Sequence, residues 1–135
     1  MDGPLKGFAL FLQKGERIPL AGFCSVSIER DADSMSIRLE GELDLACEDS
    51  FRAAVASRMA SWRPSTVIVD LRELTFIDSC GLRMLLGLDA AAREEGFELT
   101  LVRADGQVRK VLRITRLDRL LPLDRPLSGL NGSKS

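Results

Sequence analysis

A serine between an aspartate and a cysteine is the point of the sequence with the clearest chemical potential. Ser79 follows Asp78 and precedes Cys80 and Gly81. A serine hydroxyl becomes a strong nucleophile beside a general base, and an aspartate next to it in sequence is not such a base. The chain contains no histidine, which disfavours Ser-His-Asp triads, Cys-His pairs and the usual zinc sites. We therefore expect Ser79 to accept a group or contact a partner rather than attack a substrate.

The same serine also has a purely structural interpretation. Ser79 stands where a helix is expected to begin, and a serine N-cap stabilises a helix by about 1 kcal/mol because its oxygen accepts an unpaired backbone N–H. Two neighbours favour a functional role: Gly81 leaves room for an approach to the backbone, and Asp78 places a carboxylate beside the hydroxyl. Both interpretations predict that the hydroxyl lies at the start of a helix.

A strand and a helix must position this serine. Residues 66–69 (TVIV) form a short, continuous, β-branched run, which is typical of a central strand buried on both faces of a parallel sheet. A loop is expected to lead from this strand to Ser79. A helix then spans about 80–95 and ends near Gly96, and alternation predicts a strand over 97–102. Strand, helix and strand in this order favour a right-handed crossover.

The remaining patterns predict further elements of a single α/β domain. Alternating apolar residues predict a hairpin that begins near Phe23 and turns at residues 31–34. Apolar residues at helical spacing predict helices over about 47–61 and 107–115, and residues 120–123 (LLPL) are expected to form a short edge strand. Residues 1–22 are expected to be an N-terminal extension without a regular element, 23–123 the domain, and 124–135 a flexible tail.

Composition limits the classes of function. The chain has 135 residues, 45% of them hydrophobic and 29% charged, as in an ordinary globular protein. Its formal net charge of −1 requires neither nucleic acid nor an anionic membrane as partner. The three cysteines form no CxxC pair, and no apolar run reaches the roughly 18 residues of a membrane helix. These features predict a cytoplasmic protein with reduced thiols.

Three segments of the chain carry a family resemblance: residues 41–44 (GELD), the strand at 67–71 ending in Asp-Leu, and residues 76–82 (FIDSCGL). In this order they resemble the STAS domain, in particular bacterial anti-sigma factor antagonists. The resemblance covers about 23–123. It implies an α/β fold with a mixed sheet of four to five strands and about three to four helices packed mainly on one side. It also implies a binding module rather than an enzyme, with no cofactor and no metal.

The resemblance implies a phosphorylation switch at Ser79. In the family, the matching serine is phosphorylated by an anti-sigma factor that is also an ATP-dependent serine kinase, and a serine phosphatase can restore it. The unphosphorylated antagonist binds the anti-sigma factor and releases a sigma factor, whereas the phosphorylated form dissociates. A helical wheel places Leu82 and Leu86 at the margin of the sheet-facing stripe, and we expect Leu82 to contact the partner. The expected partner-binding residues are Asp44, Asp78, Ser79, Cys80, Gly81, Leu82 and Leu86.

Other interpretations stay open. Cys47 stands near a position where many family members have a threonine that caps the first helix, and Cys80 where serine or threonine is common. A STAS module of a stress-signalling assembly or of a lipid-transport system, without a role in sigma-factor control, is the main alternative. An enzyme that uses Asp44, Asp70 or Asp78 as acid and base is a second. A nucleic-acid binder is a third, prompted by the basic residues of 103–119 but lacking interleaved aromatic residues.

Overall fold

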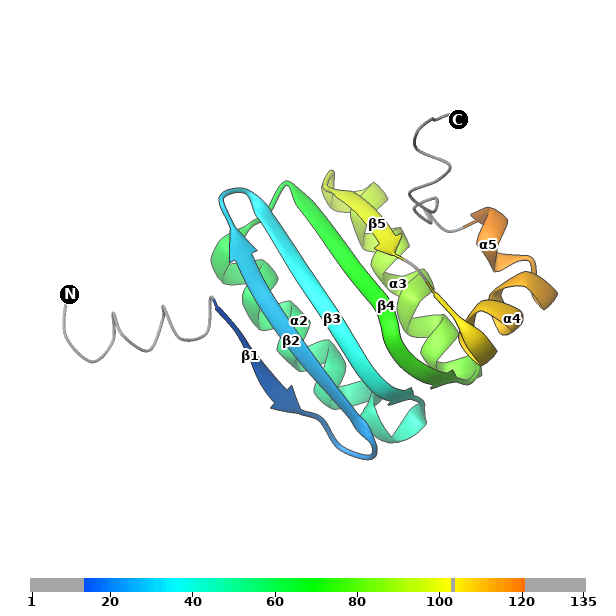
Figure 1. Ribbon diagram of the computed structural model, residues 1–135. Helices are drawn as coiled ribbons and strands as arrows, with labels where there is room; N and C mark the ends of the chain where they lie inside the picture. Colours follow the sequence, from blue (N-terminus) through cyan, green and yellow to red (C-terminus); the bar gives the residue numbers. More distant parts are fainter. Residues whose placement is uncertain (1–13, 103, 121–135) are drawn as a thin grey trace.

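A five-stranded mixed sheet forms the centre of the molecule (Figure 1). The computed structural model describes residues 14–102 and 104–120. The strands lie side by side in chain order, with the first two pairs antiparallel and the last two parallel. They are β1 (Lys14–Pro19), β2 (Cys24–Asp31), β3 (Ser34–Leu43), β4 (Thr66–Ile77) and β5 (Glu98–Val102).

Two long helices cover one face of this sheet. The 3-10 helix η1 (Leu45–Cys47) and helix α2 (Glu48–Trp62) connect β3 to β4, and α3 (Ser79–Glu95) connects β4 to β5. Figure 1 shows α2 and α3 on the same side of the sheet, with α4 (Gly106–Ile114) and α5 (Leu117–Leu120) beyond the edge formed by β5. The expected α/β fold, with a mixed sheet and helices mainly on one side, is confirmed. None of the described helices is long and apolar enough to cross a membrane.

The core lies between the sheet and the two long helices. Every second residue of a strand points toward the helices, so the apolar side chains at alternate positions are buried. The expectation that β4 is buried on both faces is wrong, because the helices cover one face only. Its residues Ile68 and Asp70 are only half-buried on the opposite, open face. There Asp70 pairs with Arg72 at 2.7 Å and with Arg38 at 3.8 Å, which gives the open face a polar surface.

Two segments differ from the expected secondary structure. Strand β1 lies within residues 1–22, where no regular element is expected, and its Ile18 pairs with Val26 of β2. The glycine and proline residues of this segment give no local indication of a strand. Pairing with the edge of β2 supplies the hydrogen bonds that make residues 14–19 a strand. Strand β4 continues to Ile77, so the expected loop before Ser79 is reduced to Asp78. The domain boundary at residue 23 stays a prediction.

The other elements follow the sequence expectations closely. The hairpin, the helices at 48–62 and 106–114 and the strand at 98–102 lie within a residue or two of their expected limits. Leu120 is the last residue of α5 rather than part of an edge strand. Residues 121–123 of that expected strand, and the expected tail at 124–135, lie outside the described residues.

Candidate functional site

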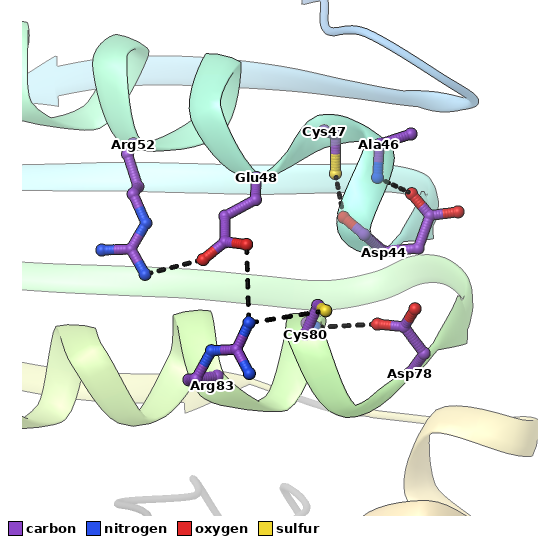
Figure 2. A network of polar contacts seen from close by, with 9 residues as sticks. Asp44, Ala46, Cys47, Glu48, Arg52, Asp78, Cys80 and Arg83 are labelled. Atoms are coloured by element: carbon purple, nitrogen blue, oxygen red, sulfur yellow. Dashed lines mark hydrogen bonds and ion pairs between the residues drawn. The ribbon is translucent and has the colours of Figure 1, made fainter.

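The carboxyl ends of two parallel strands bring Asp44 and Asp78 to one corner of the molecule. Leu43 and Ile77 are the last residues of β3 and β4, and they pair with each other. The two aspartates directly follow this pair, and the backbone N–H of Asp78 donates to the Leu43 carbonyl at 3.4 Å. Figure 2 shows both carboxylates at the same end of the helices. The sheet therefore joins the two sequence motifs that carry these residues.

Each aspartate caps the helix that it precedes. The Asp44 carboxylate accepts a hydrogen bond from the Ala46 N–H at 3.1 Å at the start of η1. The Asp78 carboxylate accepts one from the Gly81 N–H at 2.9 Å at the start of α3. An N-cap aspartate satisfies a backbone donor that the helix leaves unpaired, so both side chains are held in fixed positions.

Ser79 is the first residue of α3 and is exposed. The interpretation of Ser79 as the N-cap is wrong, because Asp78 occupies the cap position and makes the capping bond. The side-chain hydrogen bonds at this corner involve Asp78, Gly81 and Cys80, and none among the described residues involves the Ser79 hydroxyl. The site therefore presents an unengaged hydroxyl to solvent, one residue after a fixed carboxylate.

Gly81 is buried and lets α3 begin close to β3. A Cβ atom at Gly81 would lie 2.4 Å from the Leu43 carbonyl oxygen and 2.6 Å from Ile77 Cγ1. The space expected at this glycine is filled by the Leu43 carbonyl and the Ile77 side chain of the same chain. Gly81 therefore allows close packing that fixes the distance between the Asp44 and Ser79 segments, and its contact with a partner stays a prediction.

The two leucines expected to form a docking patch differ in exposure. Leu82 is only 9% exposed and belongs to the hydrophobic core, whereas Leu86 is 37% exposed. Leu82 is buried because α3 packs against α2 as well as against the sheet, and the expectation that Leu82 contacts the partner stays a prediction. A helix wheel that considers only the sheet misses this second buried side. Cys80 is half-buried near Arg83.

We expect Leu82→Ala to lower the free energy of unfolding by about 3 kcal/mol, because it removes buried methyl groups and leaves a cavity. Leu86→Ala is the matched control on the same helix and is expected to change stability by less than about 0.5 kcal/mol. Urea unfolding of both variants measures the difference. Equal, small losses would place Leu82 on the surface, as the sequence alone indicated.

The loop that precedes β2 also reaches this corner, which the sequence did not reveal. The Ala21 N–H donates to Ser50 Oγ at 3.2 Å, and the Phe23 carbonyl accepts from the Glu42 N–H at 2.9 Å. A Cβ at Gly22 would lie 3.8 Å from Asp44 Oδ1, so the loop lies directly beside this carboxylate. Phe23, which follows Gly22, is 77% exposed, and Leu45, which follows Asp44, is 64% exposed. Two large, exposed apolar residues thus adjoin the residues of this corner in the chain.

Two buried thiols lie under the corner. Cys47 occupies the N-cap position of α2 without capping it, and its thiol donates to the Asp44 carbonyl at 3.3 Å. Burial raises the pKa of Cys47, and it raises the pKa of Cys24 to about 12. Both side chains therefore stay protonated at neutral pH, a state unsuited to nucleophilic attack or metal binding. Within 14–102 and 104–120, no three His, Cys, Asp or Glu residues are placed to hold a metal ion.

The third aspartate of the acid-base alternative lies elsewhere. Asp70 lies in β4, eight residues before Asp78, which directly follows that strand, and this separation corresponds to about 26 Å of extended chain. Partial burial raises the pKa of Asp70, but hydrogen bonds from the Arg72 side chain and backbone outweigh it, and the pKa is lowered overall. Asp70 is thus held ionised on the open face, and it does not form a carboxylate pair with Asp44 or Asp78.

Known proteins are similar to this chain over most of its length. Residues 26–122 match the protein family described as "Mlab, STAS domain". A STAS-domain containing protein of Pseudomonas aeruginosa is 33% identical over 93 residues, which cover 69% of this chain and 90% of that protein. The anti-sigma F factor antagonist of Paenibacillus polymyxa is 24% identical over 98 residues, covering 73% and 84%.

A solved structure shows the same fold. The anti-sigma factor antagonist SpoIIAA in its unphosphorylated form superposes with a TM-score of 0.63 at 23% identity. The superposition covers 78% of this chain and 93% of SpoIIAA. The five-stranded mixed sheet and its helix layer are therefore a fold shared with a known protein.

Proposed function

The chain belongs to the STAS domain family, and on this premise we propose that it is an anti-sigma factor antagonist that works by partner switching. The unphosphorylated chain binds an anti-sigma factor with serine kinase activity, and the sigma factor is released. Phosphorylation of Ser79 ends this binding. The exchange takes place in the cytoplasm, where bacterial transcription occurs, and the chain itself acts as a binding module.

One observation carries the proposal: an exposed Ser79 hydroxyl without a side-chain hydrogen bond among the described residues directly follows the fixed Asp78 carboxylate, at the corner that also holds Asp44, in a fold shared with a protein named as an anti-sigma factor antagonist. The first residue of a helix favours an anion, so the fold tolerates a phosphate at this position. A partner fitted to a neutral hydroxyl beside Asp44 and Asp78 would instead meet about two additional negative charges. The switch therefore changes the surface and leaves the core intact.

The chemistry of the switch belongs to the partner. The Ser79 oxygen attacks the γ-phosphorus of ATP held by the kinase, the O–P bond forms, and the bond to the β–γ bridging oxygen breaks. ADP leaves, and the hydroxyl proton passes to a base on the kinase. A serine phosphatase reverses the change when a water oxygen bonds to phosphorus, inorganic phosphate leaves and the hydroxyl is restored.

The apolar rim of the corner supports a protein partner. Phe23 and Leu45 are the most exposed large hydrophobic residues near Asp44. Interfaces typically combine a few apolar anchors with polar groups that fix orientation, and aromatic residues are enriched among the anchors. Phe23 and Leu45 supply such anchors, while Asp44, Asp78 and Ser79 supply the polar centre.

A binding experiment with charge variants tests the proposal. Full-length wild type, Ser79→Ala and Ser79→Asp serve as immobilised baits for native cell extract with ATP or ADP, and mass spectrometry identifies the captured proteins. We expect an anti-sigma kinase to bind wild type and Ser79→Ala, and to bind Ser79→Asp roughly 100-fold more weakly, because like charges across an interface repel. Ser61→Asp is the matched control, since it adds the same charge to an exposed serine near the far end of α2.

Two results would contradict the proposal. If all four baits capture the same partners equally, Ser79 is not a switch. If the purified partner kinase transfers phosphate to wild type and equally to Ser79→Ala, another residue is the acceptor. Loss of binding in the Ser61→Asp control would point to a general effect of charge rather than to this corner.

A STAS module of a lipid-transport system is the second candidate. The matching family's description, "Mlab, STAS domain", and the name of the 33% identical relative state no role in sigma-factor control, which is compatible with this candidate. The same baits distinguish the two functions. Capture of transporter subunits by every bait, independent of the charge at position 79, would favour the second candidate.

A further inference from the structure

Arg83 is the cation of α3 that lies nearest in the chain to Ser79, and it is weakly engaged. Its guanidinium lies 3.6 Å from Glu48 Oε1 and 3.5 Å from the Cys80 sulfur, and its side chain is 60% exposed. Glu48 has a shorter contact with Arg52 at 2.8 Å. Figure 2 shows Glu48 between the two arginines, so that it bridges α2 and α3. Glu48 therefore keeps a close partner even if Arg83 moves away.

The helix places Arg83 within reach of a group attached to Ser79. The two residues are four positions apart in α3, and side chains at this spacing lie one above the other on the same face of a helix. The Asp78 carboxylate is committed to the Gly81 N–H and does not compete for Arg83 in the present geometry. An exposed arginine one turn after an exposed serine can thus swing toward that serine through side-chain rotation alone.

The other charged groups at this corner do not replace Arg83. Asp44 and Glu48 from the η1 and α2 segment, and Asp78 before α3, are all acidic. Helix α4 approaches through Gln107, whose side chain binds both the N–H and the carbonyl of Ile77, and Asp105 and Arg109 flank this glutamine. A phosphate at Ser79 therefore meets mainly acidic neighbours, and Arg83 is the nearer in the chain of the two arginines on its own helix.

We propose that Arg83 exchanges the Glu48 carboxylate for the phosphate when Ser79 is phosphorylated; the inference rests on the proposed function, since it assumes that Ser79 is the acceptor. Guanidinium binds phosphate more strongly than it binds a carboxylate, because phosphate carries more charge and more acceptor oxygens. The exchange breaks the Glu48–Arg83 link between α2 and α3. It also stabilises the phosphorylated form.

Titration of the phosphate tests this inference without any partner protein. Phosphoserine is placed at position 79 of the full chain by genetic-code expansion, and ³¹P NMR follows its second ionisation, which lies near pH 6 in the absence of neighbours. A cation in contact stabilises the dianion, so we expect the midpoint to rise by roughly 0.5 in Arg83→Gln. Arg93→Gln is the matched control: it removes an exposed arginine that pairs with Asp89 on the same helix, about ten residues farther along.

The outcomes separate this inference from the proposed function. An unchanged midpoint in Arg83→Gln, or an equal change in Arg93→Gln, overturns the role of Arg83 even if Ser79 controls partner binding. A rise confined to Arg83→Gln, with recovery in Arg83→Lys and loss of the difference in high salt, supports it. That result would hold even if the partner of this chain were not an anti-sigma factor.

Discussion

Gly81→Ala is expected to lower the free energy of unfolding by about 3 kcal/mol, because it adds a methyl group where there is no space. The new Cβ would lie 2.4 Å from the Leu43 carbonyl oxygen and 2.6 Å from Ile77 Cγ1. The first of these atoms belongs to the backbone of the central strand β3 and cannot rotate aside. The start of α3 would have to move away from β3, and Ser79 would move with it.

Gly87→Ala is the matched control in the same helix. Gly87 lies inside α3, and a Cβ there would meet no atom within 4 Å. Alanine favours a helix interior over glycine by about 1 kcal/mol, so this variant should be more stable than wild type. Urea unfolding monitored by the fluorescence of Trp62 measures the free energy of unfolding of both variants. If Gly81→Ala is also as stable as wild type, the close approach of α3 to β3 is not required.

Gly41→Ala is expected to have a similarly large effect, about 3 kcal/mol, at the other side of the site. Gly41 has φ +97, a conformation that other residues adopt only with strain, and its Cβ would lie 2.1 Å from the Phe23 carbonyl oxygen. That carbonyl accepts a hydrogen bond from the Glu42 N–H, which ties the loop before β2 to β3. The substitution would therefore displace the loop that carries the exposed Phe23.

Gly96→Ala separates the contribution of strain from that of the clash. Gly96 ends α3 with φ +86, but a Cβ there would meet nothing within 4 Å. We expect it to cost about 1 kcal/mol, the penalty of the left-handed conformation alone. Thermal and urea unfolding of both variants provide the comparison. Equal losses in Gly41→Ala and Gly96→Ala would mean that the Phe23 loop shifts freely and that its contact with β3 contributes little.

The sequence by itself determined the local structure of the site. The alternation in β2, β3 and β5 and the helical spacing in α2 and α4 are properties of short segments, and the expected elements agree with the structure to within a residue or two. The position of Ser79 at a helix start also follows from neighbouring residues. Asp78 illustrates the limit of this local reasoning, since the sequence indicates Ser79 as the cap and the hydrogen bond from the Gly81 N–H assigns this role to Asp78.

Only the tertiary structure decided how these segments meet. Strand β1 forms because the edge of β2 accepts it, and Leu82 is buried because α2 lies beside α3, and neither cause is visible within the segment itself. The pairing of Leu43 with Ile77 brings Asp44 beside Asp78, and packing at Gly22 and Gly81 adds Phe23 and Ser79 to the same corner. Contacts between residues distant in the chain depend on the register of parallel strands and on close packing, which a local pattern does not encode.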